Sequence, residues 1–231
     1  MPRDLGQRSG AQGAGQQTHS QTLHWAVLTG QEIALNSHKT VSFDNEPLIL
    51  VDADDNVTGY ETKVNAHIGE GLLHRAFSIF LFTEDDQVLL QQRSGKKPLW
   101  PLYWSNSCCS HPRKGETYDQ AVHRRLREEL AVDVDLKFLY RFQYRADFGN
   151  AGSEHELCSV FVGKVPAPVR IDVNPSEIAA WRWMPSADVD SLIAEEPDRV
   201  TPWFVMEWQR LRTEFREVIR GLRPRAMISA A

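Results

Sequence analysis

A chain of 231 residues, 42% of them hydrophobic and 25% charged, is long enough for one globular domain with a real core and an extension. The net charge of −5 argues against a nucleic-acid-binding surface, and no apolar run approaches the roughly 20 residues that a membrane-spanning helix needs. The three cysteines, two of them adjacent, do not suit a disulfide framework, so we expect a reduced, cytoplasmic protein.

The chain is expected to begin with a flexible leader over residues 1–45. Its first 20 residues are rich in Gln, Gly and Ser, and they lack the apolar stretch of a secretory signal. One ordered domain is predicted over residues 46–222, followed by a flexible tail at 223–231. The sequence leaves the oligomeric state and the role of the leader open.

The predicted elements of the domain mix strands with helices. Strands are expected at residues 47–52, 77–82, 87–92, 136–145, 156–165 and 180–184, with a hairpin joining the second and third. Helices are expected at 117–130, where Thr117 is a plausible N-cap, and at 186–193 and 202–220. This order predicts an α/β (α+β) sandwich, in which a mixed sheet lies between helices.

Several side chains that bind metals or carry protons stand near predicted strands. Cys109 and His111 share a short segment with turn residues, and His67 and His74 lie farther upstream. Glu154 and Glu156, if they lie on a strand, point to the same face. Three imidazoles and two carboxylates suit Zn²⁺ or Mn²⁺, and Mg²⁺ at higher coordination. Each histidine alone is more often a surface or capping residue, and Cys109 alone more often an inert buried thiol.

The predicted helix at 117–130 carries acidic and basic side chains. Arg125 and Glu129 are four residues apart, a spacing that often marks no more than an exposed ion pair. Glu116 and residues 124–132 nevertheless resemble the Nudix box, with departures from it. Ser110 and Ala131 stand where the box has Gly, and Arg125 stands where it has the first Glu of its Arg-Glu pair. The loss of that acid weakens the case for ordinary Nudix hydrolysis.

Many short motifs, in order, make the chain similar to the type 1 isopentenyl-diphosphate Δ-isomerases, a family with the Nudix fold. The similarity runs from about residue 47 to about residue 220. The matching segments include Trp-Ser-Asn-Ser-Cys-Cys-Ser-His-Pro at 104–112 and residues 63–67, 73–78, 142–145 and 201–203. The family motif usually has Gly where this chain has Ser110. Ordered agreement of this kind is more specific than one box.

The resemblance implies interconversion of isopentenyl and dimethylallyl diphosphate in isoprenoid biosynthesis, by protonation and deprotonation through a tertiary carbocation. Cys109 and Glu156 match the two proton-transfer residues, with Tyr144 assisting Glu156 and Trp203 facing the cation. For Cys109 to act as a thiolate base, positive neighbours must depress its pKa. The sequence does not say which of the two residues donates the proton first.

The resemblance also implies the ligands of the diphosphate and of two metals. The diphosphate would be bound by Lys63, Arg93, Lys97 and Arg125. Mg²⁺ would be held against the diphosphate by Glu129. A second divalent metal (Mn²⁺, Zn²⁺ or Mg²⁺) would be bound by His67, His74, His111, Glu154 and Glu156. The implied partner is a small isoprenoid diphosphate, with no nucleic acid. Two alternatives remain open, a Nudix pyrophosphohydrolase and a catalytically inactive binding module.

Overall fold

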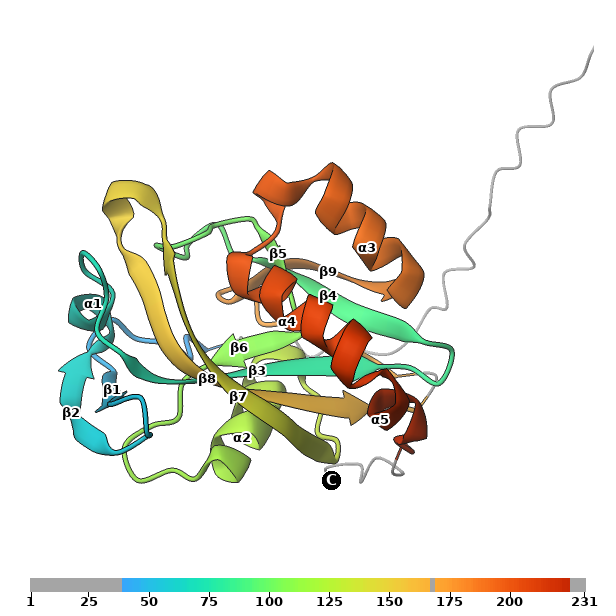
Figure 1. Ribbon diagram of the computed structural model, residues 1–231, viewed down its shortest axis with the longest axis horizontal. Helices are drawn as coiled ribbons and strands as arrows, with labels where there is room; N and C mark the ends of the chain where they lie inside the picture. The colour runs from blue at the N-terminus through green and yellow to red at the C-terminus, as the bar shows by residue number, and fades with distance from the viewer. Residues whose placement is uncertain (1–38, 167–168, 225–231) are drawn as a thin grey trace, which may run out of the picture. The chain divides into compact units, whose positions relative to one another are not determined.

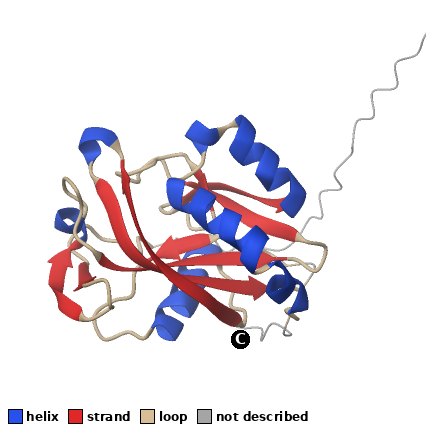
Figure 2. Ribbon diagram, in the orientation of Figure 1, coloured by secondary structure: helices blue, strands red, loops and turns tan. Residues whose placement is uncertain are grey.

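The computed structural model describes residues 39–166 and 169–224, which form a mixed sheet flanked by helices (Figures 1 and 2). The strands are β1 Pro47–Val51, β2 Val57–Thr62, β3 His74–Phe82, β4 Gln87–Arg93, β5 Trp104–Ser105, β6 Cys108–Ser110, β7 Leu136–Asp147, β8 Ser153–Lys164 and β9 Ile178–Pro185. The helices are α1 Lys63–Ala66, α2 Tyr118–Leu130, α3 Ser186–Glu195, α4 Pro202–Glu214 and α5 Arg216–Gly221. Short 3-10 turns lie at Gly149–Ala151 and Pro197–Arg199.

Strand β3 is the centre of the sheet. It pairs antiparallel with β1, β4 and β6, and parallel with β8. The long strands β7 and β8 form an antiparallel pair, and β9 lies antiparallel to β4. The short strand β6 therefore pairs with the same central strand as β8. Through these pairings Cys109, from the middle of the chain, and Glu156, from much later in it, both lie beside β3.

The two faces of the sheet bury two different cores, because successive side chains of a strand point to opposite faces. Phe77, Ile79 and Leu81 of β3 belong to a cluster with the apolar stripe of α2. Phe80 and Phe82 belong to a second cluster, with side chains from α3, α4 and α5. In Figure 1, α4 crosses one side of the sheet and α2 lies on the other. The predicted sandwich of a mixed sheet between helices is thus confirmed.

Helix α2 begins as the sequence predicts. The Thr117 side chain accepts a hydrogen bond from the Gln120 backbone, and the Gln120 side chain accepts one from the Thr117 backbone, which completes a capping box. At its other end Ala131 adopts φ = 54°, in the left-handed region that glycine prefers. The Gly of the Nudix box therefore has a backbone role that alanine fills here with strain.

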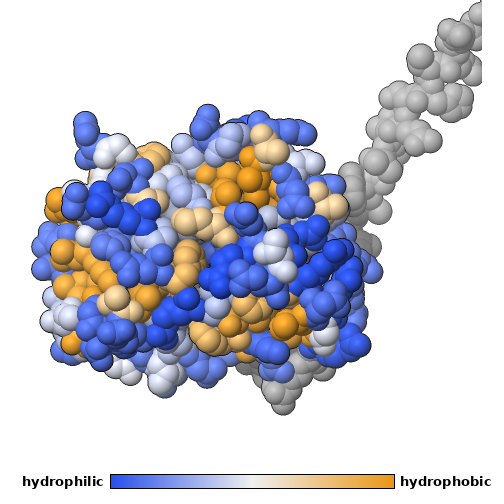
Figure 3. Space-filling view, in the orientation of Figure 1, coloured by the Kyte–Doolittle hydropathy of each residue, from blue (hydrophilic) through white to orange (hydrophobic). Residues whose placement is uncertain are grey.

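Some predicted elements differ from the structure. The helix expected at 202–220 is broken at Phe215 into α4 and α5, and strands β2, β5 and β6 were not predicted. Of the expected leader, residues 1–38 lie outside the described residues, as do 225–231 of the expected tail. None of the helices in the described part of the chain is both long and apolar enough to cross a membrane. On the face shown in Figure 3, apolar side chains form separate patches within a polar surface.

Candidate active site

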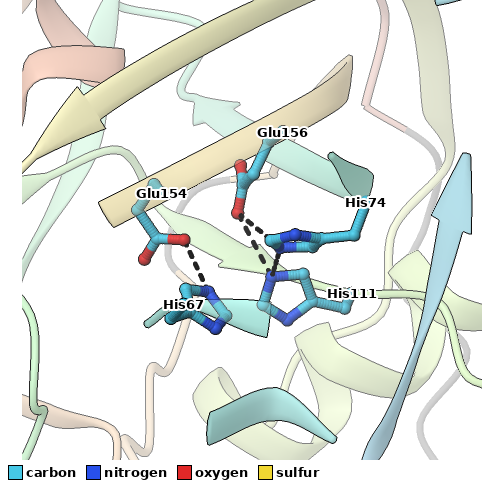
Figure 4. A group of neighbouring side chains, drawn as sticks. All are labelled: His67, His74, His111, Glu154 and Glu156. Carbon is cyan, nitrogen blue, oxygen red and sulfur yellow. Dashed lines mark hydrogen bonds and ion pairs between the residues drawn. The ribbon is translucent and has the colours of Figure 1, made fainter. Parts of the chain in front are cut away.

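Five side chains from four parts of the fold converge on one point (Figure 4). Glu154 and Glu156 project from the same face of β8, and His74 of β3 is the register partner of Glu156. His67 is the C-cap of α1, and His111 follows β6 directly. One potential ligand atom from each of the five lies within 4.8 Å of all the others. The structure therefore brings together the whole predicted His/Glu set.

The imidazoles of this cluster are oriented by backbone carbonyls. The Nδ1 atoms of His67 and His74 lie 2.6 Å and 2.7 Å from the carbonyl oxygens of Lys63 and Leu72. Each Nε2 atom is then left to face the cluster. Nε2 of His74 lies 3.2 Å from Nε2 of His111, an arrangement of two nitrogens that a shared cation would favour. Backbone acceptors of this kind are typical of metal-bound histidines, so the donor set fits a divalent metal.

Two of the three histidines, His74 and His111, are held in the neutral form that suits metal binding. The pKa of His67 is instead raised, because the Glu154 charge outweighs the effect of burial. Burial, with the neighbouring His67 charge, lowers the pKa of His74 to about 4, and burial holds the pKa of His111 well below its usual value. Neutral imidazole is the form that coordinates metals. Burial opposes ionisation of Glu154, but the 2.7 Å contact with His67 Nε2 holds its pKa low.

Glu156 has a second role in the geometry, because it also faces the Tyr144 hydroxyl. Tyr144 is its register partner on β7 and donates a 2.8 Å hydrogen bond to its Oε2. Burial and the nearby Glu154 charge raise the pKa of Glu156 well above the usual value of a carboxyl group. Burial raises the pKa of Tyr144 as well. Burial therefore favours the protonated form of both groups.

Cys109 is held as a neutral thiol. Its S–H donates a hydrogen bond to Asn106 Oδ1 at 3.0 Å. The orientation of the Asn106 amide is fixed by its Nδ2, which donates to the carbonyls of Ile79 and Cys108. Burial, followed by the charge of Glu207, raises the pKa of Cys109 to about 12, and Arg93 opposes this only in part. The surrounding protein groups thus do not supply the depressed pKa that a thiolate base would need.

One cavity of about 340 Å³ joins these groups to a cationic end. It is lined by Cys109, Tyr144, Glu156 and Trp203, and also by the predicted anion ligands Lys63, Arg93, Lys97 and Arg125. Trp203, near the start of α4, has the Arg93 guanidinium 5.2 Å from its ring centre. The structure therefore places the predicted proton-transfer and diphosphate residues around one space.

The cationic side chains at one end of the cavity repel one another. Burial and repulsion from Lys97 and Arg125 lower the pKa of Lys63 to about 8, and its Nζ donates to Ser42 Oγ at 2.6 Å. The Arg125 Nε atom is buried and has no hydrogen-bond partner among the described residues. Glu129 contacts Arg125 but is not among the residues that line the cavity. Glu129 thus lies next to the cavity through its contact with Arg125, which lines it.

Several residues in and around this site were not predicted from the sequence. Thr40 and Ser42, inside the expected leader, line the cavity. Glu177 lines it too, although it lies in a loop with no motif. Asn106 stands in the motif around Cys109, which was a signal for it, whereas Glu207 lies in a helix whose pattern does not single it out. Only the tertiary structure shows that Asn106, Glu177 and Glu207 are buried.

Comparisons with known proteins show the family and the fold of the chain. A family model described as "NUDIX domain" matches residues 72–204. Isopentenyl-diphosphate Delta-isomerase 1 of Photorhabdus laumondii subsp. laumondii is 44% identical over 165 residues, covering 71% of this chain and 93% of that protein. Isopentenyl-diphosphate Delta-isomerase of Burkholderia multivorans is 45% identical over 159 residues, covering 69% and 89%. The crystal structure of DR0079 from Deinococcus radiodurans, at 24% identity, shares the fold, with a TM-score of 0.59 over 71% of this chain and 98% of that one.

Proposed function

This chain belongs to the isopentenyl-diphosphate Delta-isomerase family and has a NUDIX domain, and we propose that it interconverts isopentenyl and dimethylallyl diphosphate. One proton is added to the terminal carbon of the alkene, which leaves a tertiary carbocation. One proton is then lost from the methylene carbon on the other side of the cationic carbon, so that the double bond shifts and the proton balance is restored. The observation that carries this proposal is the single cavity lined by Cys109, Glu156 and Trp203 together with the diphosphate-binding cations.

Cys109 and Glu156 are the proposed proton-transfer groups, assisted by Tyr144. The reaction needs one protonated and one unprotonated group, whereas burial favours the protonated form of both. A divalent metal at the His/Glu cluster would stabilise the ionised form of Glu156. The Tyr144 hydroxyl, 2.8 Å from Oε2, would then hold the carboxylate in place. General acid and base groups of this kind contribute typically 10²–10⁴-fold to a rate.

Trp203 is proposed to stabilise the carbocation. It is almost fully buried at the cavity wall, with its ring beside the Arg93 guanidinium. An aromatic face offers about 0.5–2 kcal/mol to a cation, and more when water is excluded. Trp203 and the apolar Leu99 line the same cavity as the proposed proton-transfer groups, so the ring is within the space where the cation would form.

The diphosphate is proposed to bind Lys63, Arg93, Lys97 and Arg125. The buried, unpartnered Nε of Arg125 supports this, because a buried donor without an acceptor is costly until a ligand supplies one. Glu129 is proposed to hold Mg²⁺ against the diphosphate. The His/Glu cluster is proposed to bind Mn²⁺, Zn²⁺ or Mg²⁺, and the protein to act in the cytoplasm.

The competing function is a Nudix pyrophosphohydrolase. It is disfavoured because Arg125 replaces an acidic residue of the box and is engaged with Glu128, Glu129 and Glu177. The discriminating experiment incubates the metal-loaded protein with isopentenyl diphosphate and resolves the products. Dimethylallyl diphosphate is expected. Release of phosphate or of a monophosphate would instead indicate a hydrolase, and unchanged substrate would indicate an inactive binding module.

A further inference from the structure

A carboxylate that no motif indicates lies at the cationic end of the cavity. Glu177 is 3% exposed, stands just before β9 and lines the cavity. Its carbonyl accepts a 2.8 Å hydrogen bond from the Ser94 backbone, and its own backbone N–H donates to the Asn174 carbonyl at 3.0 Å. The backbone on which the side chain stands is therefore fixed from two directions.

The Glu177 carboxylate contacts two of the four cations assigned to the diphosphate. It forms an ion pair with Lys97, and its Oε2 lies 3.3 Å from Arg125 Nη2. Burial disfavours its ionisation, but the charges of Lys97 and Arg125 outweigh this and lower its pKa. A fixed negative charge thus occupies the subsite that has to receive a negatively charged group.

This arrangement distinguishes Glu177 from Glu129. Both contact Arg125, but of the two only Glu177 is among the residues that line the cavity. A metal-free diphosphate has to displace Glu177 from Lys97 and then lie beside it, with like charges a few ångströms apart. A divalent cation removes this repulsion. Mg²⁺ is commonly bound through one or two carboxylates together with substrate phosphates.

We propose that Glu177 makes diphosphate binding depend on Mg²⁺, by repelling the metal-free anion from Lys97 and Arg125 and by offering a carboxylate oxygen to the cation that accompanies it. This role rests on the proposed function, since it presumes that the diphosphate binds at these cations. It selects the metal complex of the substrate over the free anion, and so makes Glu177 a specificity-determining residue.

The test is calorimetric titration with inorganic diphosphate, with and without added Mg²⁺, on protein already loaded at the His/Glu cluster. Glu177→Gln is expected to raise the affinity for metal-free diphosphate about tenfold, because one unit charge near the bound anion is removed. The gain in affinity on adding Mg²⁺ should shrink by a similar factor. Glu46→Gln is the matched control, because Glu46 pairs with Arg113 and does not line the cavity, and it should behave like the unmodified protein.

A second variant covers the case in which Glu177→Gln does not fold. Lys97→Gln with Glu177→Gln removes both partners of the ion pair and leaves no uncompensated buried charge, and it should show the same reduced dependence on Mg²⁺. The inference is overturned if the foldable variants keep the Mg²⁺ dependence of the unmodified protein while binding diphosphate. Absence of diphosphate binding by the unmodified protein under both conditions would overturn the proposed function, and this inference with it.

Discussion

Glu207→Gln should flatten a loss of stability that the protein is expected to show as the pH rises from about 4.5 to about 8. Glu207 lies on the buried face of α4 and is fully buried, and no salt bridge to it is found in the described part of the chain. One carboxyl oxygen accepts a hydrogen bond from the Cys158 thiol at 3.6 Å, and the other has no hydrogen-bond partner among the described residues. Burial therefore raises the pKa of Glu207 from 4.5 to about 8.

The sign and size of the effect follow from proton linkage. Between these pH values the folded protein keeps the Glu207 proton and the unfolded chain releases it, so the free energy of unfolding falls with rising pH. The stabilising contribution is complete below pH 4.5 and is lost as the pH passes 8. At about 1.4 kcal/mol for each pH unit, the total loss is of the order of 5 kcal/mol.

The measurement is urea unfolding at pH 5, 6, 7 and 8, with equal metal loading of all samples. The free energy of unfolding of Glu207→Gln, minus that of the unmodified protein, should rise steadily with pH. Taking this difference cancels the titration of all other groups. Glu214→Gln, at an exposed position of the same helix, is the control and should give a constant difference. If the Glu207→Gln curve runs parallel to that of the unmodified protein, Glu207 is not held neutral by burial.

Three further predictions concern the proposed chemistry and the box. Cys109→Ala should lower turnover at least about a hundredfold while the circular dichroism spectrum stays unchanged. The control Cys158→Ala should retain most of its activity. Near-normal turnover of Cys109→Ala would show that Cys109 takes no part in catalysis. His74→Ala should lower the metal content measured by elemental analysis, and His155→Ala, outside the cluster, should not; equal metal contents would exclude His74 as a ligand. Ala131→Gly should stabilise the protein by about 1 kcal/mol in thermal unfolding, because φ = 54° favours glycine, and a lower melting temperature would contradict the strain assigned to this position.

Local patterns predicted the elements whose stability is largely local or whose apolar face is regular. The Thr117 N-cap and the apolar stripe of α2 were visible in the sequence, and so was the dense apolar run of β3. Strand β6 was not predicted, because three residues carry no usable periodicity and are extended only through pairing with β3. The break at Phe215 was missed for a related reason, since an apolar pattern can continue across a change in helix direction.

The sequence by itself determined the family resemblance and supplied the candidate proton-transfer and metal-binding residues, because thiol, imidazole and carboxylate groups stand out in ordered motifs. The tertiary structure alone decided the environment of those candidates. Burial, a property of the whole fold, keeps the Cys109 thiol neutral and raises the pKa of Glu156. The tertiary structure also places Glu177 in the cavity wall and Glu207 on the buried face of α4, where distant segments meet and no local pattern predicts the contact.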